Sequence, residues 1–375
     1  MDKIRMVDLH GQYLKIKNEV DQRLSEVLDQ TAFINGPEVK EFAFKLGEYL
    51  ESNVIPCANG TDALQIAIMA LDTKPGDEVI LPAYTYVATA EVIALLRLKP
   101  VFVDVDPQLF TINVEQVESN ITSKTKAIFP VHLFGQCAEM EGLLDIIGES
   151  DIAIIEDNAQ AIGADYQFKD GRINKAGTLG TIGTTSFFPS KNLGCFGDGG
   201  AMITNDPKMA EKLRVLANHG QYKKYHHDII GVNSRLDTVQ SAVLLAKLPR
   251  LDDYNQYRQQ VAARYDELLE DLDEVRTPAR ANYSTHVFHQ YTIQVSHEVR
   301  DALKEHLLSN GIPSMIYYPI PLHLQKGYEH YGYKKGSFPI SEYLSGIVLS
   351  LPIHTELTDE QQLFICDKIR NFFKR

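Results

Sequence analysis

The sequence contains no tryptophan and only four cysteines among its 375 residues. The cysteines, Cys57, Cys137, Cys195 and Cys366, are far apart, and none has a C-x-x-C partner or a histidine at metal-ligand spacing. Widely separated cysteines of this kind are typical of reduced, buried thiols. The sequence therefore predicts neither a disulfide framework nor a structural zinc site.

Long apolar runs are also lacking. No run approaches the length needed to cross a bilayer, and the first 13 residues contain no apolar signal-peptide core. We therefore expect a soluble, cytoplasmic protein without a membrane partner. Basic residues are outnumbered, with 37 Lys and Arg against 50 Asp and Glu, and the formal net charge is −13. Because binding to a phosphate backbone depends on clustered Lys and Arg, this balance argues against a nucleic-acid partner.

The length and the 44% hydrophobic content indicate a globular protein with enough chain for two lobes. Between residues 58 and 205, helix-like segments alternate with apolar segments that suit strands. The expected strands are 78–82, 100–105, 126–134, 152–158, 184–190 and 201–205. This alternation predicts an α/β fold with a mostly parallel central sheet flanked by helices. Ligands of such sheets bind at the carboxyl ends of the strands.

The pattern changes near Pro249, where one expected helix stops and a second, amphipathic helix begins over 250–272. Beyond it the sequence predicts a half-buried strand at 286–295, a helix at 299–311 and a last helix that begins with a threonine cap. We therefore expect a large domain at 1–248, with an N-terminal helix, and a smaller α+β domain at 249–375.

Lys191 lies in the segment SFFPSKNLGCFGDGG, between an expected strand and a glycine-rich turn. A primary amine held there can form a Schiff base with pyridoxal phosphate, provided that an acid lies near the pyridine nitrogen and donors surround the phosphate. The alternative is a solvated turn, which most Lys-Gly strings form. Other residues must decide between the two interpretations.

Asp157 stands at the end of an expected buried strand, and Gln160 follows three residues later. A carboxylate in that place needs a cationic partner, and a protonated pyridine nitrogen would supply one. If a helical turn begins at Asp157, the Gln160 amide lies on the same face and can reach the ring hydroxyl. Asp157 also fits the alternative role of capping a following helix.

Gly60 and Thr61, in the segment ANGTDAL, stand where a helix is expected to start, and free backbone N–H groups there suit a phosphate. Ser186 can add a hydroxyl from the strand before the lysine. An aromatic ring that could stack on a flat cofactor follows another strand, and we favour Tyr86 over Tyr84. These positions fall at the ends of different strands of one sheet, and together they favour the pyridoxal phosphate interpretation.

The segments ANGTDAL, GDEVILPAYTYVATA, IEDNAQAIGA, SFFPSKNLGCFGDGG and YYPIPLHLQ together resemble the DegT-type nucleotide-sugar aminotransferases, which are fold-type I enzymes dependent on pyridoxal phosphate. The resemblance runs from VDLHGQY to the last helix. It implies that Lys191 and Asp157 are catalytic: the lysine binds the cofactor covalently and moves the substrate proton, while the aspartate pairs with the pyridine nitrogen. It also implies cofactor contacts for four further residues: Gln160 at the ring hydroxyl, and Gly60, Thr61 and Ser186 at the phosphate.

The resemblance further implies a homodimer with shared active sites. The loop 219–235 would reach into the neighbouring subunit, where Asn233 completes the phosphate site and Arg235 meets a substrate carboxylate. Three more positions match residues near the sugar pocket: Tyr317, Tyr318 and His323.

The same resemblance implies transfer of an amino group from L-glutamate to a keto nucleotide sugar, for the biosynthesis of cell-surface polysaccharide such as the O-antigen of lipopolysaccharide. The pattern LGCFGDGG, with the segment around HGQYKKYHH, is most similar to the subset that aminates C3 of UDP-2-acetamido-2-deoxy-3-oxo-glucuronate. Amination of C3 or C4 in another UDP- or dTDP-ketodeoxyhexose is the alternative.

Three interpretations compete from other classes. Asp104 and Asp106 form a D-x-D pair whose spacing can hold a divalent cation on a sugar diphosphate, as in a metal-dependent glycosyltransferase. A hydrolytic metal site at His226 and His227 is disfavoured, because adjacent side chains do not easily share a face. A noncatalytic sensor that retains the fold is disfavoured by the complete set of cofactor residues. We therefore expect no metal.

Overall fold

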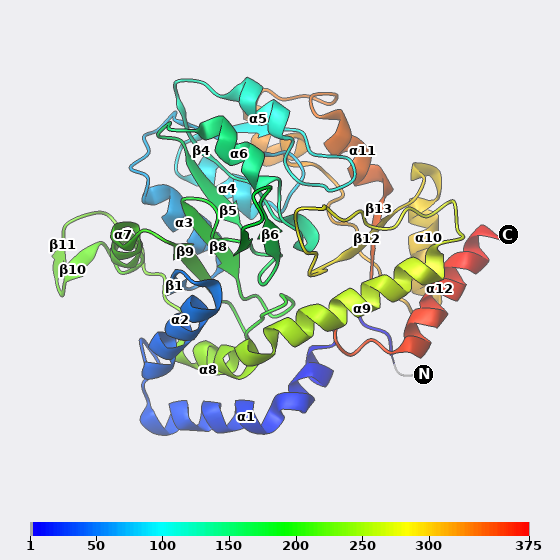
Figure 1. The fold of residues 1–375 in the computed structure, drawn as a ribbon, viewed down its shortest axis with the longest axis horizontal. Helices are drawn as coiled ribbons and strands as arrows, with labels where there is room; N and C mark the ends of the chain where they lie inside the picture. The colour runs from blue at the N-terminus through cyan, green and yellow to red at the C-terminus, as the bar shows by residue number, and fades with distance from the viewer. Residues whose placement is uncertain (1–2, 375) are drawn as a thin grey trace.

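The structure is a computed structural model that describes residues 3–374. Its centre is a seven-stranded sheet with the strand order β1-β9-β8-β5-β4-β2-β3 (Figure 1). In chain order the strands of this sheet are β1 (Asn53–Cys57), β2 (Glu78–Pro82), β3 (Lys99–Val103), β4 (Thr125–Ile128), β5 (Ala153–Asp157), β8 (Ile182–Ser186) and β9 (Gly200–Thr204).

Most neighbours in this sheet run parallel. The pairs β2·β3, β2·β4, β4·β5 and β5·β8 are parallel, whereas β9 is antiparallel to both β8 and β1. The reversal follows from the connection: the loop 187–199 joins β8 to its immediate neighbour without a crossover helix. The predicted α/β fold with a mostly parallel sheet is confirmed.

Helices cover both faces of the sheet. Successive residues of β2 illustrate why, because Ile80 and Leu81 belong to two different buried clusters on opposite faces. One cluster includes residues of α3, α4 and α7, and the others include residues of α2, α5, α6 and α8. The helices of this lobe are α1 (Leu9–Gln30), α2 (Pro37–Leu50), α3 (Gly60–Met69), α4 (Ala88–Leu95), α5 (Val114–Asn120), α6 (Met140–Ile147), α7 (Pro207–Ala217) and α8 (Thr238–Lys247).

The C-terminal part of the chain has a buried cluster of its own, centred on a two-stranded antiparallel sheet. Its last helix begins at a capping box in which Thr358 is the N-cap, so the predicted threonine cap is confirmed. The elements of this part are α9 (Leu251–Leu269), β12 (Tyr291–Gln294), α10 (His297–Ser309), α11 (Pro339–Ile347), β13 (Val348–Leu351) and α12 (Asp359–Phe373).

Several short elements complete the described chain: β6 (Asp165–Gln167), β7 (Ile173–Lys175), the hairpin β10 (Gln221–Lys223) with β11 (His226–His227), and the 3-10 turns η1 (Leu133–Gly135), η2 (Leu248–Arg250), η3 (Leu322–Leu324) and η4 (Lys326–Tyr331). Three expected strands end or begin several residues inside their predicted bounds, and one of them, expected at 184–190, ends at Ser186. The one expected at 126–134 stops at Ile128, and the one expected at 286–295 begins only at Tyr291.

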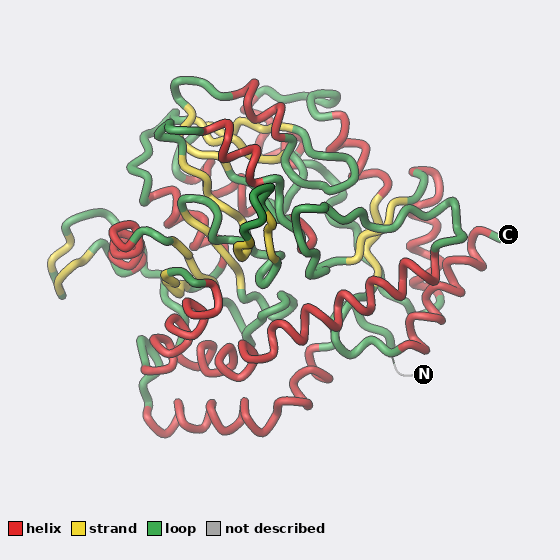
Figure 2. The backbone as a smooth tube through the Cα atoms, in the orientation of Figure 1, coloured by secondary structure: helices red, strands yellow, loops and turns green. Residues whose placement is uncertain are grey.

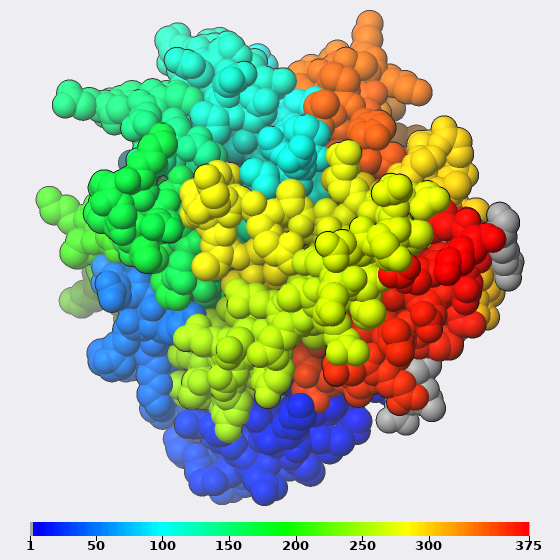
Figure 3. Space-filling view, turned by 45° about the vertical axis from the view of Figure 1, so that its right-hand side comes forward, coloured from blue at the N-terminus to red at the C-terminus, as the bar shows by residue number. Residues whose placement is uncertain are grey.

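We propose the domain boundary at residues 248 and 249, where α8 gives way to the long helix α9. Figure 2 shows α9 as one continuous helix that leads from α8 toward the C-terminal elements. The two parts nevertheless interlock, because Leu322, Tyr328 and Phe338 pack within the cluster of the large lobe. In Figure 3 the N-terminal segment (blue) lies beside α9 and the C-terminal segment (red). No helix among residues 3–374 is both long and apolar enough to cross a membrane.

Candidate active site

A cavity of about 470 Å³ opens at the carboxyl ends of the central strands. This is the place where parallel α/β sheets bind their ligands, and the volume is in the range of small-molecule sites. Its wall comes from several connections: residues 59–64 at the start of α3, 85–88 after β2, 131–134 after β4, 157–160 at the end of β5, 184–191 along and after β8, and 317–318 from the C-terminal part.

Lys191 lies in this wall, half-buried, on the loop that returns from β8 to β9. Its backbone N–H donates to Phe188 O at 2.8 Å, whereas its Nζ makes no hydrogen bond or ion pair with any residue of the described chain. Burial lowers the pKa of this amine from 10.5 to about 8, and the negative charge of Asp157 partly offsets that effect. A larger fraction of the amine is therefore neutral and nucleophilic near neutral pH than for an exposed lysine.

The loop that carries Lys191 is held from several sides. Buried Lys247, on α8, donates from Nζ to Gly194 O at 2.7 Å. The thiol of Cys195 contacts Phe187 O at 3.0 Å. All four cysteines are free, buried thiols, as the sequence predicted. The first contact ties the loop to α8 and the second closes the loop on itself, which restricts where the Lys191 amine can lie.

Asp157 ends β5 with its side chain 6% exposed at the cavity. One carboxylate oxygen accepts from Thr89 Oγ1 at 2.9 Å, and the other accepts from Ala159 N at 3.2 Å. No basic side chain forms an ion pair with it within residues 3–374, so the carboxylate is available to a cationic ligand. No helix begins at Asp157, because residues 159–163 form turns. The condition for placing Gln160 on the same face is therefore not met, and Asp157 has no helix to cap.

Gln160 still reaches the cavity without that helix, because the chain turns back at once after β5. Its Oε1 accepts from Phe134 N at 2.8 Å, and its Nε2 donates to Tyr318 Oη at 3.2 Å. These two contacts distinguish the oxygen of the Gln160 amide from its nitrogen. A second N–H of the amide remains for a ligand.

The first residue of α3 is Gly60, and the backbone N–H groups of Gly60 and Thr61 have no acceptor within the described residues. Ser186, the last residue of β8, lies against this helix start: a Cβ on Gly60 would stand 2.7 Å from the Cβ of Ser186. Only glycine leaves room there. Asn59 caps the helix by accepting from Asp62 N at 2.8 Å, a role that its residue type alone could have predicted.

Tyr86 is 55% exposed and lines the cavity, with its ring centroid 6.1 Å from that of Tyr318. Tyr84, in contrast, is fully buried. Its hydroxyl donates to Tyr317 O at 2.5 Å and accepts from Tyr318 N at 3.0 Å. The structure thus separates the two tyrosines: Tyr86 is open to a ligand, and Tyr84 fastens the segment of Tyr317 and Tyr318 to the wall.

Three residues named in the sequence analysis do not line the cavity. Asn233 is exposed and Arg235 half-buried, on the strand-like segment that follows the protruding hairpin β10–β11 (Figure 1). His323 is buried with its Nε2 3.0 Å from Glu342 Oε1. A contact of His323 with the sugar stays a prediction.

Sequence reasoning missed other residues of the wall, among them Thr85, Thr184, Asp198, His289 and Gln290. Burial, with the nearby charges of Lys191 and Arg258, lowers the pKa of His289 well below its usual range, so its imidazole is neutral at neutral pH. No local signal marks His289 as part of a site built around residues 60–191. Its position depends on the packing of the C-terminal part against the large lobe.

The D-x-D pair is structural. Asp104 is 2% exposed, and its carboxylate accepts from the backbone N–H groups of Ile340 and Ser341, both at 2.8 Å, at the start of α11. Asp106 accepts from the backbone of the turn that follows it. Both carboxylates therefore cap backbone groups, which overturns the interpretation of this pair as a cation site. Residues 3–374 contain no cluster of three or more His, Cys, Asp or Glu side chains arranged to hold a metal.

We expect Asp104→Ala to lower the free energy of unfolding by about 2–4 kcal/mol, because it leaves the buried donors of α11 without an acceptor. Asp106→Ala is the matched control, and we expect it to cost only about 1 kcal/mol because its turn is largely exposed. Urea denaturation measures both. A chelator should not destabilise the wild-type protein; if it did, a metal rather than the cap would explain the role of Asp104.

The cavity combines an unpaired, half-buried lysine, a buried carboxylate without a basic partner and a helix start with free N–H groups. A pyridoxal-phosphate site requires these three features. The sequence pattern of the DegT/DnrJ/EryC1/StrS aminotransferase family matches residues 14–370. The chain belongs to this family, and the glycosyltransferase alternative is therefore wrong.

Individual relatives cover the whole chain. It is 46% identical over 374 residues to the "Pleiotropic regulatory protein" of Geobacillus stearothermophilus, with 99% of each chain covered. It is 42% identical over 369 residues to the UDP-2-acetamido-2-deoxy-3-oxo-D-glucuronate aminotransferase of Pseudomonas aeruginosa, covering 98% of this chain and 100% of the relative.

The fold agrees with solved structures. A DegT/DnrJ/EryC1/StrS aminotransferase from Brucella abortus superposes with a TM-score of 0.94 at 44% identity, covering 99% of this chain and 100% of that one. NtdA from Bacillus subtilis, solved with the cofactor PMP bound, gives a TM-score of 0.88 at 31% identity over 96% of this chain and 82% of its own.

The residues of the cavity fit this cofactor. Pyridoxal phosphate presents an aldehyde, a pyridine nitrogen and a phosphate, and the wall offers one group for each. The unpaired amine of Lys191 suits the aldehyde, the buried carboxylate of Asp157 suits the protonated nitrogen, and the free N–H groups at Gly60 and Thr61 suit the phosphate. The protein is a pyridoxal-phosphate-dependent aminotransferase.

Proposed function

We propose that this protein transfers an amino group from L-glutamate to a keto nucleotide sugar, most directly to C3 of UDP-2-acetamido-2-deoxy-3-oxo-glucuronic acid. The observation that carries the proposal is that the unpaired amine of Lys191 and the buried carboxylate of Asp157 line the same cavity, where the charge of Asp157 acts on the amine. The choice of sugar rests on the Pseudomonas relative, which matches over nearly the whole chain. We place the reaction in the cytoplasm, in the synthesis of a cell-surface polysaccharide such as O-antigen.

When bound, pyridoxal phosphate supplies the electron sink that lets a carbon next to nitrogen give up its proton. Lys191 binds the cofactor and then carries that proton, for which its lowered pKa suits it, because a neutral amine accepts a proton readily. Asp157 would favour the protonated pyridine nitrogen through its negative charge. Thr89 holds the carboxylate in place through its hydroxyl.

The remaining residues orient the cofactor. Gly60, Thr61 and Ser186 hold the phosphate at the start of α3, where the helix dipole favours an anion. Gln160 would offer its free N–H to the ring hydroxyl, and Tyr86 would supply an aromatic ring to stack on the cofactor. Tyr317 and Tyr318, which also line the cavity, are proposed to contact the sugar.

We also propose a homodimer with shared active sites. Asn233 and Arg235 lie outside the cavity of their own chain, next to a hairpin that protrudes from the lobe (Figure 1). That hairpin carries exposed Tyr222 and Tyr225, a kind of surface that suits an interface. In the partner's cavity, Asn233 would complete the phosphate site, and Arg235 would meet a substrate carboxylate.

Mixing subunits tests the shared site. Lys191→Ala and Arg235→Ala homodimers should each be nearly inactive, because every cavity lacks one essential group. Heterodimers formed by refolding the two together should recover up to about a quarter of the wild-type rate, since one of the two cavities then has both residues in half of the assemblies. The measurement is the rate of glutamate-dependent transamination before and after mixing. Absence of recovery would favour self-contained subunits.

A substrate panel tests the reaction itself. The purified enzyme is incubated with glutamate and, in turn, with 3-keto and 4-keto sugars linked to UDP or dTDP. We expect 2-oxoglutarate to form fastest with the 3-keto UDP-glucuronate derivative. Faster turnover of a C4-keto or a dTDP-linked ketodeoxyhexose would assign the alternative substrate instead. A first half-reaction with glutamate but no turnover of any sugar would favour a sensor.

A further inference from the structure

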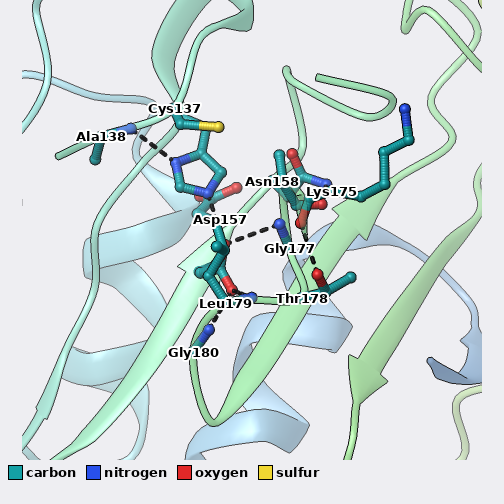
Figure 4. A network of polar contacts seen from close by, with 12 residues as sticks. Cys137, Ala138, Asp157, Asn158, Lys175, Gly177, Thr178, Leu179 and Gly180 are labelled. Atoms are coloured by element: carbon teal, nitrogen blue, oxygen red, sulfur yellow. Dashed lines mark hydrogen bonds and ion pairs between the residues drawn. The ribbon is translucent and has the colours of Figure 1, made fainter. Parts of the chain in front are cut away.

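A buried carboxylate lies directly next to Asp157 in the sequence but serves a different purpose. Glu156 precedes it in β5, so their side chains point to opposite faces of the sheet. The fully buried carboxylate of Glu156 accepts from Gly177 N at 2.8 Å, from Leu179 N at 2.7 Å and from Gly180 N at 2.6 Å (Figure 4). The loop thus forms an anion-binding nest that the chain itself occupies.

Glycine makes the nest possible. Gly177 has a φ of 85°, and a Cβ there would lie 2.7 Å from the side-chain nitrogen of Asn158. A Cβ on Gly180 would lie 2.7 Å from Ile154 O. Larger residues would therefore push the loop away from β5, and its N–H groups would no longer reach Glu156.

The fourth donor to Glu156 is His132, which is also fully buried. Its Nε2 lies 2.9 Å from Glu156 Oε2, and its Nδ1 accepts from Ala138 N at 3.1 Å (Figure 4). Because a backbone N–H can only donate, Nδ1 carries no proton, and Nε2 must be the nitrogen that donates to Glu156. The contacts therefore select one neutral tautomer of the imidazole.

The backbone of His132 is bonded to the catalytic strand as well. His132 N donates to Asp157 O at 3.0 Å, and Asp157 N donates to Pro130 O at 2.9 Å. Segment 130–132 thus continues the parallel pairing of β4 alongside Asp157, beyond the end of the strand itself. Any displacement of His132 would therefore also displace the backbone of Asp157.

The loop that His132 fastens through Ala138 reaches the other side of the cavity. Phe134, within this loop, donates from its N–H to Gln160 Oε1 at 2.8 Å and accepts from Gln290 N at 3.2 Å. Gln160 and Gln290 both line the cavity. One imidazole is therefore connected to the strand of Asp157 by one nitrogen and to the loop that orients Gln160 by the other.

We propose that His132 is a positioning residue that sets Asp157 and Gln160 together against the cofactor ring. Its Nε2–H anchors Glu156, and thereby β5, while its Nδ1 holds the loop 133–138. The proposal rests on the proposed function only in taking Asp157 and Gln160 as contacts of pyridoxal phosphate. It predicts that the two nitrogens of His132 make separable contributions.

Two isosteric variants separate these contributions. In His132→Asn the carboxamide oxygen can replace Nδ1 and still accept from Ala138, but the donor to Glu156 is lost. In His132→Gln the amide nitrogen can replace Nε2 and still donate to Glu156, but the acceptor for Ala138 is lost. His132→Leu removes both, and Glu156→Gln replaces one acceptor of the nest by a donor.

Each full-length variant is measured in three ways that need no sugar substrate. These are the dissociation constant for pyridoxal phosphate, the pH midpoint of the visible absorbance of the bound cofactor, and the melting temperature without cofactor. We expect His132→Asn and Glu156→Gln to shift the pH midpoint, because the charge of Asp157 no longer lies in its best position. We expect His132→Gln to keep the wild-type pH midpoint. It should bind the cofactor about tenfold more weakly, because a tenfold change in the dissociation constant corresponds to the loss of one hydrogen bond.

A merely structural role gives a different pattern. If the variants melt at lower temperature but bind the cofactor with wild-type affinity and midpoint, the positioning role is overturned. Equal shifts of the midpoint in His132→Asn and His132→Gln would also overturn it, because the two nitrogens would then not act separately. Should His132→Leu fail to fold, the two isosteric variants still decide. Failure of the wild-type protein to turn over any keto sugar would contradict the proposed function and would leave these binding results interpretable.

Discussion

Lys191→Ala is expected to abolish transamination, with a loss of at least about 10³–10⁴-fold in the rate of the half-reaction with glutamate. By the proposed mechanism the variant loses both the amine that binds the cofactor and the base that moves the substrate proton, and no other lysine among residues 3–374 lines the cavity. The measurement is a single-turnover reaction of the purified protein with glutamate, followed by the absorbance of the cofactor.

Lys191→Arg is the matched control for charge. A guanidinium keeps a positive charge at the same place but stays protonated, so it can neither form a Schiff base nor accept a proton. Both variants should therefore lose the visible absorbance that reports the covalent bond, while still binding the cofactor through its phosphate. Turnover in Lys191→Arg at more than a few per cent of the wild-type rate would show that another group performs the chemistry.

Asp157→Ala should reduce the rate by about 10²–10³-fold, because a preorganised charge opposite the pyridine nitrogen is lost from a buried position. Asp157→Asn is the sharper variant. It keeps the size of the side chain and an oxygen that accepts from Thr89, but it removes the charge. We expect it to lose nearly as much activity as Asp157→Ala, with cofactor affinity reduced less.

Thr89→Val provides the comparison for Asp157→Asn. It removes one hydrogen bond to the carboxylate and leaves the charge, so we expect a loss of only about tenfold. The order Asp157→Ala, Asp157→Asn and then Thr89→Val, from the largest loss to the smallest, identifies charge as the important property. If Asp157→Asn had the wild-type rate, the pyridine nitrogen would need no anionic partner in this enzyme.

Much of the lining of the cavity could be predicted because its parts have local signals. Lys191 stands between a strand and a glycine turn, Asp157 ends an apolar strand, and Gly60 begins a helix; each pattern spans fewer than ten residues. The rule that parallel sheets bind ligands at their carboxyl ends then places these residues together. The cavity contains all three, together with Thr61 and Ser186.

Other features depend on contacts between distant segments. Nothing near Asp104 in the sequence indicates that its carboxylate caps α11, more than 230 residues later. The absence of a helix after Asp157 follows from the turn of the chain at 158–163, where Gly163 has a φ of 87°. His289 reaches the cavity only because the C-terminal part packs against the large lobe.

The sequence by itself determined the type and order of the main elements, and it named Lys191 and Asp157, which both line the cavity, as candidates for the catalytic amine and acid. It could do so because hydrophobic period, helix caps and glycine turns depend on residues only a few positions apart. The tertiary structure alone decided that β9 runs antiparallel, that Glu156 fills a nest of backbone N–H groups, and that His132 joins the two sides of the cavity. Each of these depends on which strands become neighbours and on which buried donor finds an acceptor. Such pairings are settled when the whole chain is packed and every buried polar group must be satisfied.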